Sequence, residues 1–398
     1  MRTLLIDFDL DQPPDEPLLL PGPRRVRAVV WRGEEPLGQI TLQAIAAIEP
    51  ELVKSEAARQ LGASISRPRP RPSRRPTLPA ITVAIPTRNR PADLAVCLDF
   101  LRMQTGPSPH EVIVVDNAPS DAETRNLVEG REGVRYVVEH VQGLSFARNR
   151  ALREATGEIV AFVDDDTRPP PGWLHSVAVV FALAPEVGVC SGPVVPAELE
   201  TEAQELFERR GGFTQTFERL VLDRDAPGRP LLVGALACGC NLAVRKDALR
   251  RLGGFDVALG AGTPAVGGED YDVVYRMLAA GHLFAYEPST LLRHRHRRDR
   301  RALARQMESW GRGTVAFLMK CRQSGEAPRI DVWRTIAWLF AYEVRRLVAS
   351  LRPGSADRFP VSLVLVEIGG CIRGLWAYRR SRRYVREVTR AHGRGQSP

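Results

Sequence analysis

Cysteine is scarce in this chain and never occurs in the paired spacing that binds structural zinc. Six cysteines are scattered through 398 residues, and only Cys238 and Cys240 lie close together. Without a CxxC pair, we expect reduced thiols, no structural zinc and a cytoplasmic protein. The first residues, MRTLLIDFDLDQPPD, also lack a basic segment followed by an apolar core, so we expect no secretory signal.

Long uninterrupted hydrophobic runs are also missing. The longest apolar stretch, residues 359–378, contains Glu367 and Arg373 near its middle, where charges are costly in hydrocarbon. We therefore expect no spanning helix and at most peripheral contact with the inner face of the cell membrane. Residues 333–348 and 359–376 would then lie on the anionic surface, where the head groups would meet Arg379, Arg380, Arg382 and Arg383. The alternative is packing of these segments against the rest of the protein.

Glycine-rich phosphate loops are absent where a nucleotide-binding fold would place them. The segment PTRNRP at 86–91 contains no glycine, which excludes a GxGxxG fingerprint there and disfavours a sugar-phosphate nucleotidyltransferase. No aromatic RNA-binding motif or recognisable DNA-binding helix accompanies the net charge of +9, so we expect no nucleic-acid partner. The charge favours other anionic partners, namely nucleotide phosphates or an acidic membrane.

The length of the chain and its proline-rich run predict several structural units. A chain of 398 residues exceeds what one hydrophobic core usually organises. Residues 24–31 alternate like a strand and begin a hairpin with a following helix, which predicts a small α+β segment over 1–66. The run RPRPRPSRRPTLP makes 67–79 an extended basic linker. Residues 306–398 are predicted to be helical, with a basic tail.

Between these parts, residues 80–305 alternate strand-like and helix-like segments. Apolar runs occur at 81–85, 111–115, 134–138 and 158–163, with helical patterns between them. Short buried strands separated by helices predict an α/β domain with a mostly parallel sheet covered on both faces. Such sheets bind ligands at the carboxyl ends of their strands, so the polar residues that follow each strand are the candidates for function.

Three consecutive aspartates, Asp164, Asp165 and Asp166, follow the fourth of these strands. Adjacent carboxylates repel one another unless a cation or hydrogen-bond donors compensate. Oxygen ligands of this kind suit Mg²⁺ or Mn²⁺, which also bind phosphate oxygens and water. The triplet therefore predicts a divalent metal, and the alternative is a solvated acidic turn that caps the following helix.

Four motifs in order resemble those of family 2 glycosyltransferases: IPTRNRP at 85–91, VVDNAPSD at 114–121, GLSFARNRAL at 143–152 and FVDDDTRP at 162–169. The resemblance covers about residues 81–305. It implies the GT-A fold, a Rossmann-like nucleotide-sugar-binding domain. It also implies transfer of a sugar from a nucleotide-diphosphate sugar with inversion at the anomeric carbon.

The same resemblance implies a donor site. Asp116 matches the acid that contacts the nucleotide base, although an Asx turn is the structural alternative. Arg148 and Asn149, at the head of a helix, match residues that reach the donor phosphate or sugar, although a surface position for Arg148 is an equal alternative. The loop beneath the nucleoside is matched by Pro86, Thr87 and Arg88.

The implied metal site draws on two segments. Asp164 and Asp166 match the first and last acids of the family's Asp-X-Asp motif. Asp166 is the preferred ligand of the divalent metal. Asp164 would face the ribose or the water molecules around the metal. Asp165 is grouped with the donor-binding residues. In TLLRHRH, a strand would put both imidazoles on one face, and the family often places a histidine here. His294 is the first choice as ligand and His296 the second; the alternatives are diphosphate binding or a surface position.

A candidate base follows the Gly267-Gly268 turn. Glu269 and Asp270 open a predicted helix and resemble the acceptor-side Glu-Asp motif of the family. Single displacement needs a base for the acceptor hydroxyl, and a helix start keeps a carboxylate ionised. We assign Asp270 as the base and Glu269 as its partner, against the alternative that both acids only cap the helix.

The sequence thus predicts an inverting, metal-assisted glycosyltransferase. Its acceptor would be a hydroxyl of a glycan, a lipid-linked molecule or another small molecule, and no motif identifies the sugar, nucleotide or acceptor. The competing class is a non-catalytic basic protein that binds nucleotide sugars or membranes. The run RRDRRALAR at 297–305 adds positive charge suited to a pyrophosphate donor, although a solvated helix face is the alternative.

Overall fold

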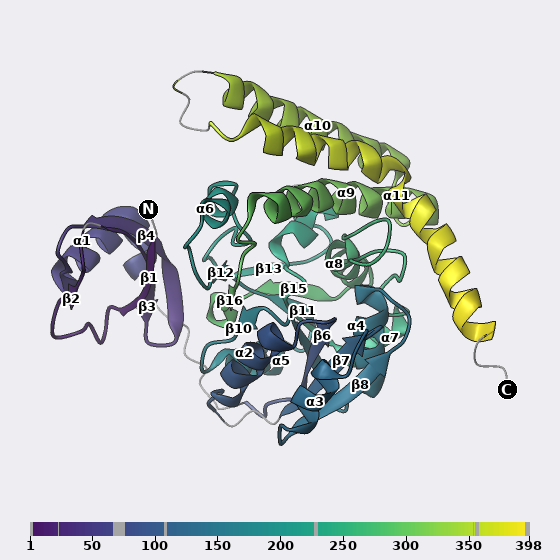
Figure 1. Cartoon of the computed structure of the whole chain (residues 1–398), viewed down its shortest axis with the longest axis horizontal. Helices are drawn as coiled ribbons and strands as arrows, with labels where there is room; N and C mark the ends of the chain where they lie inside the picture. The colour runs from purple at the N-terminus through teal and green to yellow at the C-terminus, as the bar shows by residue number, and fades with distance from the viewer. Residues whose placement is uncertain are drawn as a thin grey trace.

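A computed structural model describes residues 3–22, 24–66, 76–106, 110–226, 230–352, 354 and 358–394. A small N-terminal unit lies beside a central sheet domain, and long C-terminal helices cross one side of that domain (Figure 1). Most of the predicted linker, residues 67–75, lies outside the described residues, and residues 76–79 contain no helix or strand.

The N-terminal unit is a three-stranded sheet covered by one helix. The predicted hairpin is present, because β3 pairs with β4 in antiparallel register, and α1 follows it with Val53 and Ala57 buried. The sequence analysis missed β1, which pairs with β3 in parallel. A two-stranded ladder, β2 with β5, extends the unit. The bounds are β1 Leu4–Asp9, β2 Leu18–Leu19, β3 Arg24–Arg32, β4 Glu35–Ala44, β5 Ala47–Ile48, α1 Pro50–Leu61 and a 3₁₀ turn Gly62–Ser66.

The central sheet has eight strands in the order β13-β15-β11-β14-β9-β6-β7-β8. The four predicted strands, β6 to β9, are confirmed and run parallel to one another. Strands β14 and β13 are antiparallel to their neighbours, while β11 and β15 pair in parallel. The bounds are β6 Ile81–Thr87, β7 His110–Asn117, β8 Val134–Glu139, β9 Ile159–Val163, β11 Val187–Ser191, β13 Leu220–Leu222, β14 Asn241–Arg245 and β15 Leu283–Tyr286.

Helices cover both faces of this sheet, as the continuous apolar strands require. One core joins the sheet to α4, α7 and α8, and a second core on the other face joins it to α2, α3 and α5. The mostly parallel α/β architecture is therefore confirmed. The bounds are α2 Pro91–Arg102, α3 Glu123–Glu129, α4 Leu144–Glu154, α5 Trp173–Leu183, α6 Glu202–Arg209, α7 Lys246–Arg251 and α8 Glu269–Ala279, with 3₁₀ turns at Pro230–Leu236 and Pro288–Thr290.

A second, three-stranded sheet brings distant segments to the aspartate triplet. Its order is β10-β16-β12, from β10 Thr167–Arg168, β16 Leu292–His294 and β12 Val194–Pro196. In the antiparallel pairing of β10 with β16, Thr167 lies opposite His294. The strand β16 ends at His294, so His296 lies just beyond it. The two imidazole rings nevertheless lie side by side, with ring centroids 5.6 Å apart.

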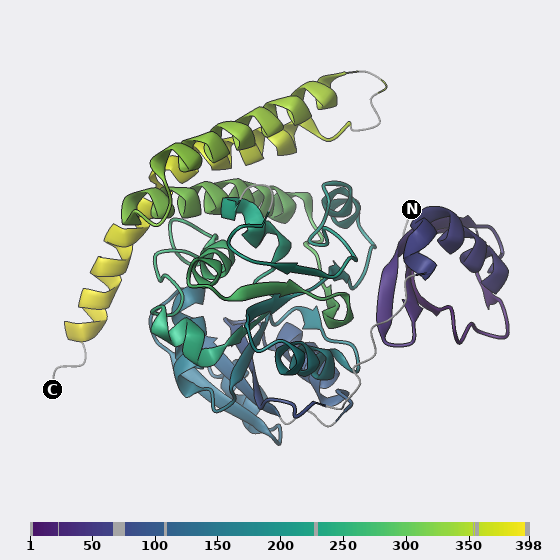
Figure 2. The same ribbon diagram turned by 180° about the vertical axis from the view of Figure 1, so that it is seen from behind.

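The C-terminal part consists of three helices: α9 Arg300–Ser324, α10 Arg329–Leu351 and α11 Val361–Arg394. Helix α11 packs along α9 and then α10, and its end extends past the central domain (Figure 2). Since α9 begins at Arg300, the boundary predicted at 305 falls inside this helix. Within α11, Val361–His392 is long and apolar enough to cross a membrane by length and composition, but 44% of its most apolar window is buried against protein.

Candidate functional site

The candidate donor site lies where β6, β7 and β9 end. Asp116 is fully buried near the end of β7. The Tyr136 hydroxyl donates to Asp116 Oδ2 at 2.8 Å, while Asp116 Oδ1 has no hydrogen-bond partner in the described part of the chain. Burial raises the pKa of this carboxyl. The predicted Asx turn is absent, because the Ala118 N–H donates to the Glu139 carbonyl instead. Asp116 therefore keeps one acceptor oxygen for a ligand.

The loop after β6 reaches towards the aspartates. Pro86 lies opposite Val115 in the sheet, and the Thr87 hydroxyl donates to Asp165 Oδ2 at 2.7 Å. Arg88 is exposed, with its Nε 3.4 Å from the Ala118 carbonyl. The loop thus connects the ends of β6, β7 and β9, with Arg88 and Asn89 exposed to solvent.

Each aspartate of the triplet has its own surroundings. Asp165 and Asp166 are buried and share the Arg90 guanidinium, a partner that the sequence analysis did not identify. Burial raises the pKa of Asp165 to about 7. Although burial acts in the same sense on Asp166, its neighbours His294 and Arg90 hold the pKa of that carboxyl well below its usual range. The alternative of a solvated acidic turn is therefore wrong for these two residues.

Asp164, in contrast, keeps 34% of its side chain exposed. Its carboxylate belongs to a group with Cys240 and His294, in which one ligand atom from each residue lies within 4.8 Å of the others. His294 Nε2 also lies 3.0 Å from Asp166 Oδ1. Adjacent ligands on one divalent ion are about 3 Å apart, and opposite ones about 4 to 4.6 Å. Asp164, Cys240 and His294 are therefore close enough to share one metal ion, and Asp166 adjoins this group through His294.

His296 has different contacts from those predicted. Its Nε2 lies 2.8 Å from Glu208 Oε1, and its Nδ1 lies 3.4 Å from His294 Nδ1. Glu208 in turn pairs with Arg27 of the N-terminal unit. Because Glu208 holds His296 and the group with Asp164 and Cys240 includes His294 but not His296, we assign His296 to support of His294 and not to the metal.

Arg148 is 1% exposed, so the alternative of a surface position is wrong. Its guanidinium donates to Glu269 Oε1 at 2.9 Å and to the Gly239 carbonyl at 2.8 Å, and lies 3.5 Å from Asp164 Oδ1. Arg148 therefore connects the acid that precedes the candidate base with the first acid of the triplet.

Asn149 differs from the expectation of donor contact. Its amide nitrogen donates to the Phe255 carbonyl at 2.9 Å, and its amide oxygen accepts the Phe255 N–H at 2.8 Å. Both the nitrogen and the oxygen of the Asn149 side-chain amide are thus hydrogen-bonded to the backbone. Asn149 thus fixes the loop after α7 rather than offering a group to the donor.

Asp270 and Glu269 begin α8 directly after Gly268, whose φ of 89° is a left-handed conformation that favours glycine. The Gly239 N–H donates to Asp270 Oδ2 at 3.3 Å. Burial and the neighbouring Glu269 raise the pKa of Asp270 to about 7. Asp270 is thus held by the 238–240 turn and has a pKa suited to accepting a proton near neutral pH.

The 238–240 turn is the feature that sequence reasoning missed. Cys240 belongs to the Asp164 and His294 group, while Gly239 contacts both Arg148 and Asp270. The only signal in the sequence was the close spacing of Cys238 and Cys240, since a turn of three residues has no periodicity. This turn joins the candidate metal site to the candidate base.

The basic run after His296 is only partly directed at the site. Arg297 lies 3.6 Å from Asp166, and Asp299 caps α9 through the Ala302 N–H. Arg298 instead pairs with Glu198 and Glu200. One arginine of the run is therefore placed to meet an anionic donor.

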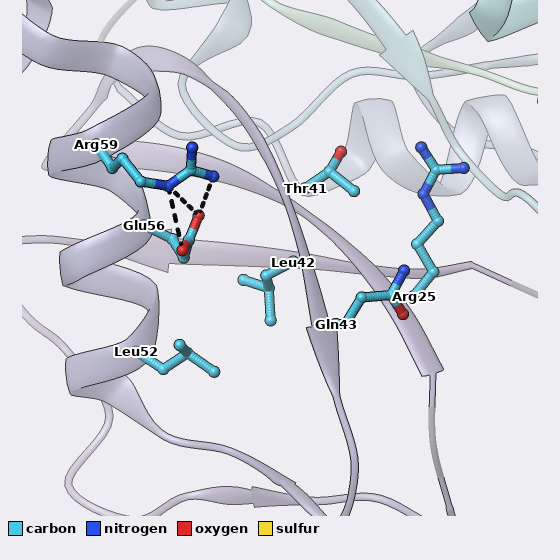
Figure 3. A pocket seen from close by; sticks show the side chains of 7 residues that line it. All are labelled: Arg25, Thr41, Leu42, Gln43, Leu52, Glu56 and Arg59. Carbon is cyan, nitrogen blue, oxygen red and sulfur yellow. Dashed lines mark hydrogen bonds and ion pairs between the residues drawn. The ribbon is translucent and has the colours of Figure 1, made fainter.

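A hollow of about 560 Å³ lies away from these residues, on the N-terminal unit (Figure 3). Its walls come from β3, β4 and α1, and its polar groups include an ion pair between Glu56 and Arg59. None of the aspartates or histidines of the candidate site lines it. We therefore place the chemistry at the strand ends and not in this hollow.

Comparison with known proteins identifies the central domain. The sequence model described as glycosyl transferase family 2 matches residues 82–253, which include the donor loop, the triplet and the 238–240 turn. Residues 82–253 form a family 2 glycosyltransferase domain. This assignment excludes the nucleotidyltransferase alternative, and the relatives named as enzymes disfavour a purely binding role.

Two relatives show how far the similarity of this glycosyltransferase extends. The pre-mycofactocin glycosyltransferase of Mycobacterium tuberculosis strain H37Rv is 29% identical over 339 residues, covering 82% of this chain and 68% of the relative. The validoxylamine A glucosyltransferase of Streptomyces hygroscopicus subsp. limoneus is 30% identical over 235 residues, covering 53% of this chain and 51% of the relative. The first similarity therefore extends well beyond the family 2 domain.

A solved structure shows the same fold. A mannosyltransferase from Pyrobaculum calidifontis, in complex with GDP-Man and Mn²⁺, aligns with a TM-score of 0.51 over 82% of this chain and 94% of its own. Its sequence identity is 22%, so the comparison supports the fold alone. The GT-A architecture expected from the sequence is thus confirmed.

Proposed function

We propose that this glycosyltransferase moves a sugar from a nucleotide-diphosphate sugar to an acceptor hydroxyl, with inversion and with a divalent metal. The observation that carries the proposal is one connected cluster. The 238–240 turn contacts Asp270 through Gly239 and joins the Asp164 and His294 group through Cys240. Donor activation and proton removal would therefore take place in neighbouring parts of one site.

Asp164, Asp166 and His294 would hold the metal, since a carboxylate and imidazole donor set suits Mn²⁺ and Mg²⁺. A bound divalent cation supplies positive charge that stabilises a departing nucleoside diphosphate. Arg90 neutralises part of the negative charge of Asp165 and Asp166, which keeps these two carboxylates compatible in a buried position. Arg297 adds a cation at the same edge.

Asp270 would act as the general base. The acceptor oxygen attacks the anomeric carbon as the bond from that carbon to the phosphate oxygen breaks, and the acceptor proton passes to Asp270. Glu269 is held by buried Arg148, so it positions the start of α8 rather than competing for the proton. The attack from the face opposite the leaving group gives the inverted product.

The donor base would bind at Asp116. Its free Oδ1 is buried and has no partner among the described residues, so an N–H of the base would satisfy it. The hydrogen bond between Thr87 and Asp165 fixes the neighbouring strand ends, and exposed Arg88 would meet the nucleotide. Asp116→Ala should therefore weaken binding of the nucleoside diphosphate without affecting the fold of the sheet.

The acceptor is proposed from similarity. Pre-mycofactocin is the first acceptor to test, because the relative with that name aligns with 82% of this chain. A small-molecule, glycan or lipid-linked hydroxyl remains within the same proposal.

We also propose peripheral binding at the inner face of the cell membrane. Helix α10 exposes one apolar stripe, in which Ile330, Val344 and Leu351 fall at multiples of seven residues. The neighbouring row contains exposed Arg334, Arg345 and Arg352. An apolar stripe flanked by arginines suits a helix lying on an anionic surface. Glu367, near the start of α11, instead pairs with Arg210 and Arg346, which favours packing over spanning.

Calorimetric titration with GDP and with UDP tests the donor and metal parts of the proposal. Mn²⁺ should strengthen binding of one nucleotide to the parent protein. Asp166→Ala and His294→Ala should each remove most of this metal dependence while thermal unfolding stays cooperative. Equal metal-dependent affinity in the parent and both variants would remove the two residues from the metal site.

A further inference from the structure

Resting on the proposed metal-assisted function, we propose that Cys240 is a thiolate ligand of the metal, beside Asp164 and His294. A sulfur ligand would make the site select Mn²⁺, Co²⁺ or Zn²⁺ over Mg²⁺. From the sequence we expected reduced thiols and no structural zinc, so this assignment comes from the structure.

Strand register places Cys240 at the triplet. In the antiparallel pairing of β14 with β9, Asn241 lies opposite Val163. Cys240 precedes Asn241, and Asp164 follows Val163, so the two residues meet at the same end of the ladder. The third member of the group, His294, is placed by a separate ladder, in which it lies opposite Thr167. Two independent strand pairings therefore converge on one point.

Hydrogen bonds of Asn241 hold the 238–240 turn in place beside the triplet. The Asn241 amide donates to the Thr290 carbonyl at 2.8 Å, which ties the start of β14 to the segment that leads into β16. The Asn241 N–H donates to the Cys238 carbonyl at 2.8 Å, which closes the turn. Cys240 is 2% exposed, so its sulfur faces protein groups rather than bulk water.

The chemistry of the group distinguishes among metals. Asp164, Cys240 and His294 offer one oxygen, one sulfur and one nitrogen within 4.8 Å of one another. Carboxylate oxygens suit all the candidate ions, whereas thiolate suits transition metals and Zn²⁺ and is a poor ligand for Mg²⁺. A site of three carboxylates and water would not discriminate in this way. Cys240 is therefore the residue that would set the metal preference.

Cys238 provides a matched control. It lies two residues away in the same turn, with its sulfur 3.1 Å from that of Cys240, but it does not belong to the group with Asp164 and His294. Serine at either position changes one sulfur to oxygen and keeps nearly the same size. A general effect on the turn would appear in both variants, whereas loss of a ligand would appear only in Cys240→Ser.

The test is cobalt titration of the full chain, freed of metal and kept reduced, in the presence of GDP and then of UDP. A thiolate bound to Co²⁺ gives a charge-transfer band in the near ultraviolet. We expect this band in the parent and in Cys238→Ser, and its loss in Cys240→Ser. By calorimetry, the preference for Mn²⁺ over Mg²⁺ should fall in Cys240→Ser by about tenfold or more, as ligand changes at metal sites do.

Each outcome decides the assignment. Persistence of the band in Cys240→Ser, or its loss only in Cys238→Ser, overturns it. Co²⁺ binding to the parent without a charge-transfer band also overturns it, and leaves the metal-assisted function in place. Failure of the parent to bind Co²⁺, Mn²⁺ or Mg²⁺ with either nucleotide would overturn both the assignment and the proposed use of metal.

Discussion

Asp270 has two neighbours that act on it in opposite directions. Glu269 disfavours its ionised form, whereas buried Arg148 favours it. Asp270→Asn keeps the shape and should preserve donor binding, but the amide accepts a proton poorly. We expect the transfer rate to fall about 10²- to 10⁴-fold, measured as turnover at saturating donor.

Glu269→Gln is the matched comparison for that substitution. Because the amide removes the nearer of the two carboxylates paired with buried Arg148, the melting temperature should fall while part of the transfer activity remains. A parental transfer rate in Asp270→Asn with correctly bound donor would show that Asp270 only caps the helix.

The pH dependence follows from the same carboxyl. Burial raises the pKa of Asp270 to about 7, so below that pH the group is protonated and cannot accept the acceptor proton. The rate should therefore rise with pH and level off above about 7, measured as kcat/KM at saturating metal. In Asp270→Asn this rising limb should disappear. A limb that persists unchanged would assign the titration to another group.

At single positions, the sequence predicted residues whose role depends on where a strand or helix ends. Asp116, Asp166 and Asp270 are of this kind, and the structure places each of them at the ligand-binding edge or beside the candidate metal group. Arg90 and Cys240 were missed because their roles depend on contacts between segments distant in the chain. Arg148 was ambiguous, since a sequence gives no measure of whether an arginine is buried.

Among the elements, α6 connects the N-terminal unit with the candidate metal site. Glu208 on α6 contacts both His296 and Arg27, and His296 contacts His294. Groups that orient a metal-binding histidine typically change metal affinity 10- to 100-fold when altered. We expect Glu208→Gln and Arg27→Gln to weaken Mn²⁺ binding by about that factor, measured by calorimetry with the nucleoside diphosphate.

Glu205 on the same helix provides the control. It also faces the N-terminal unit, near Arg25, but it has no contact with His296. Glu205→Gln should leave Mn²⁺ affinity at the parental value. Equal weakening in Glu205→Gln and Glu208→Gln would mean that the interface acts only through stability.

The elements themselves were predictable to different degrees. Strands β6 to β9 were found because short, mostly apolar runs separated by helical patterns predict a parallel sheet. The strands β10 and β16 have two and three residues, too few for periodicity, and their pairing brings His294 to the triplet. The part of the site that depends on long-range register was therefore beyond sequence reasoning.

At the scale of the whole molecule, the C-terminal helices test the membrane proposal. The parent should sediment with anionic vesicles and not with neutral ones. Val344→Glu combined with Val348→Glu places two charges in the exposed stripe of α10 and should abolish sedimentation without changing thermal stability. Ala341→Glu is a less informative variant, because the native alanine side chain is small and contributes little apolar surface. If the parent sediments with neither anionic nor neutral vesicles, the proposal that α10 binds a membrane is wrong.

The most direct test of the central claim is the anomeric configuration of the first product. The parent with Mn²⁺ is mixed with a panel of α-linked donors that includes UDP-glucose and GDP-mannose, and early products are followed by proton NMR before mutarotation. A donor which reacts should release or transfer its sugar first as the β anomer, and Asp270→Asn should lose this reaction. An initial α anomer, or an equal rate in Asp270→Asn, would contradict single displacement assisted by Asp270.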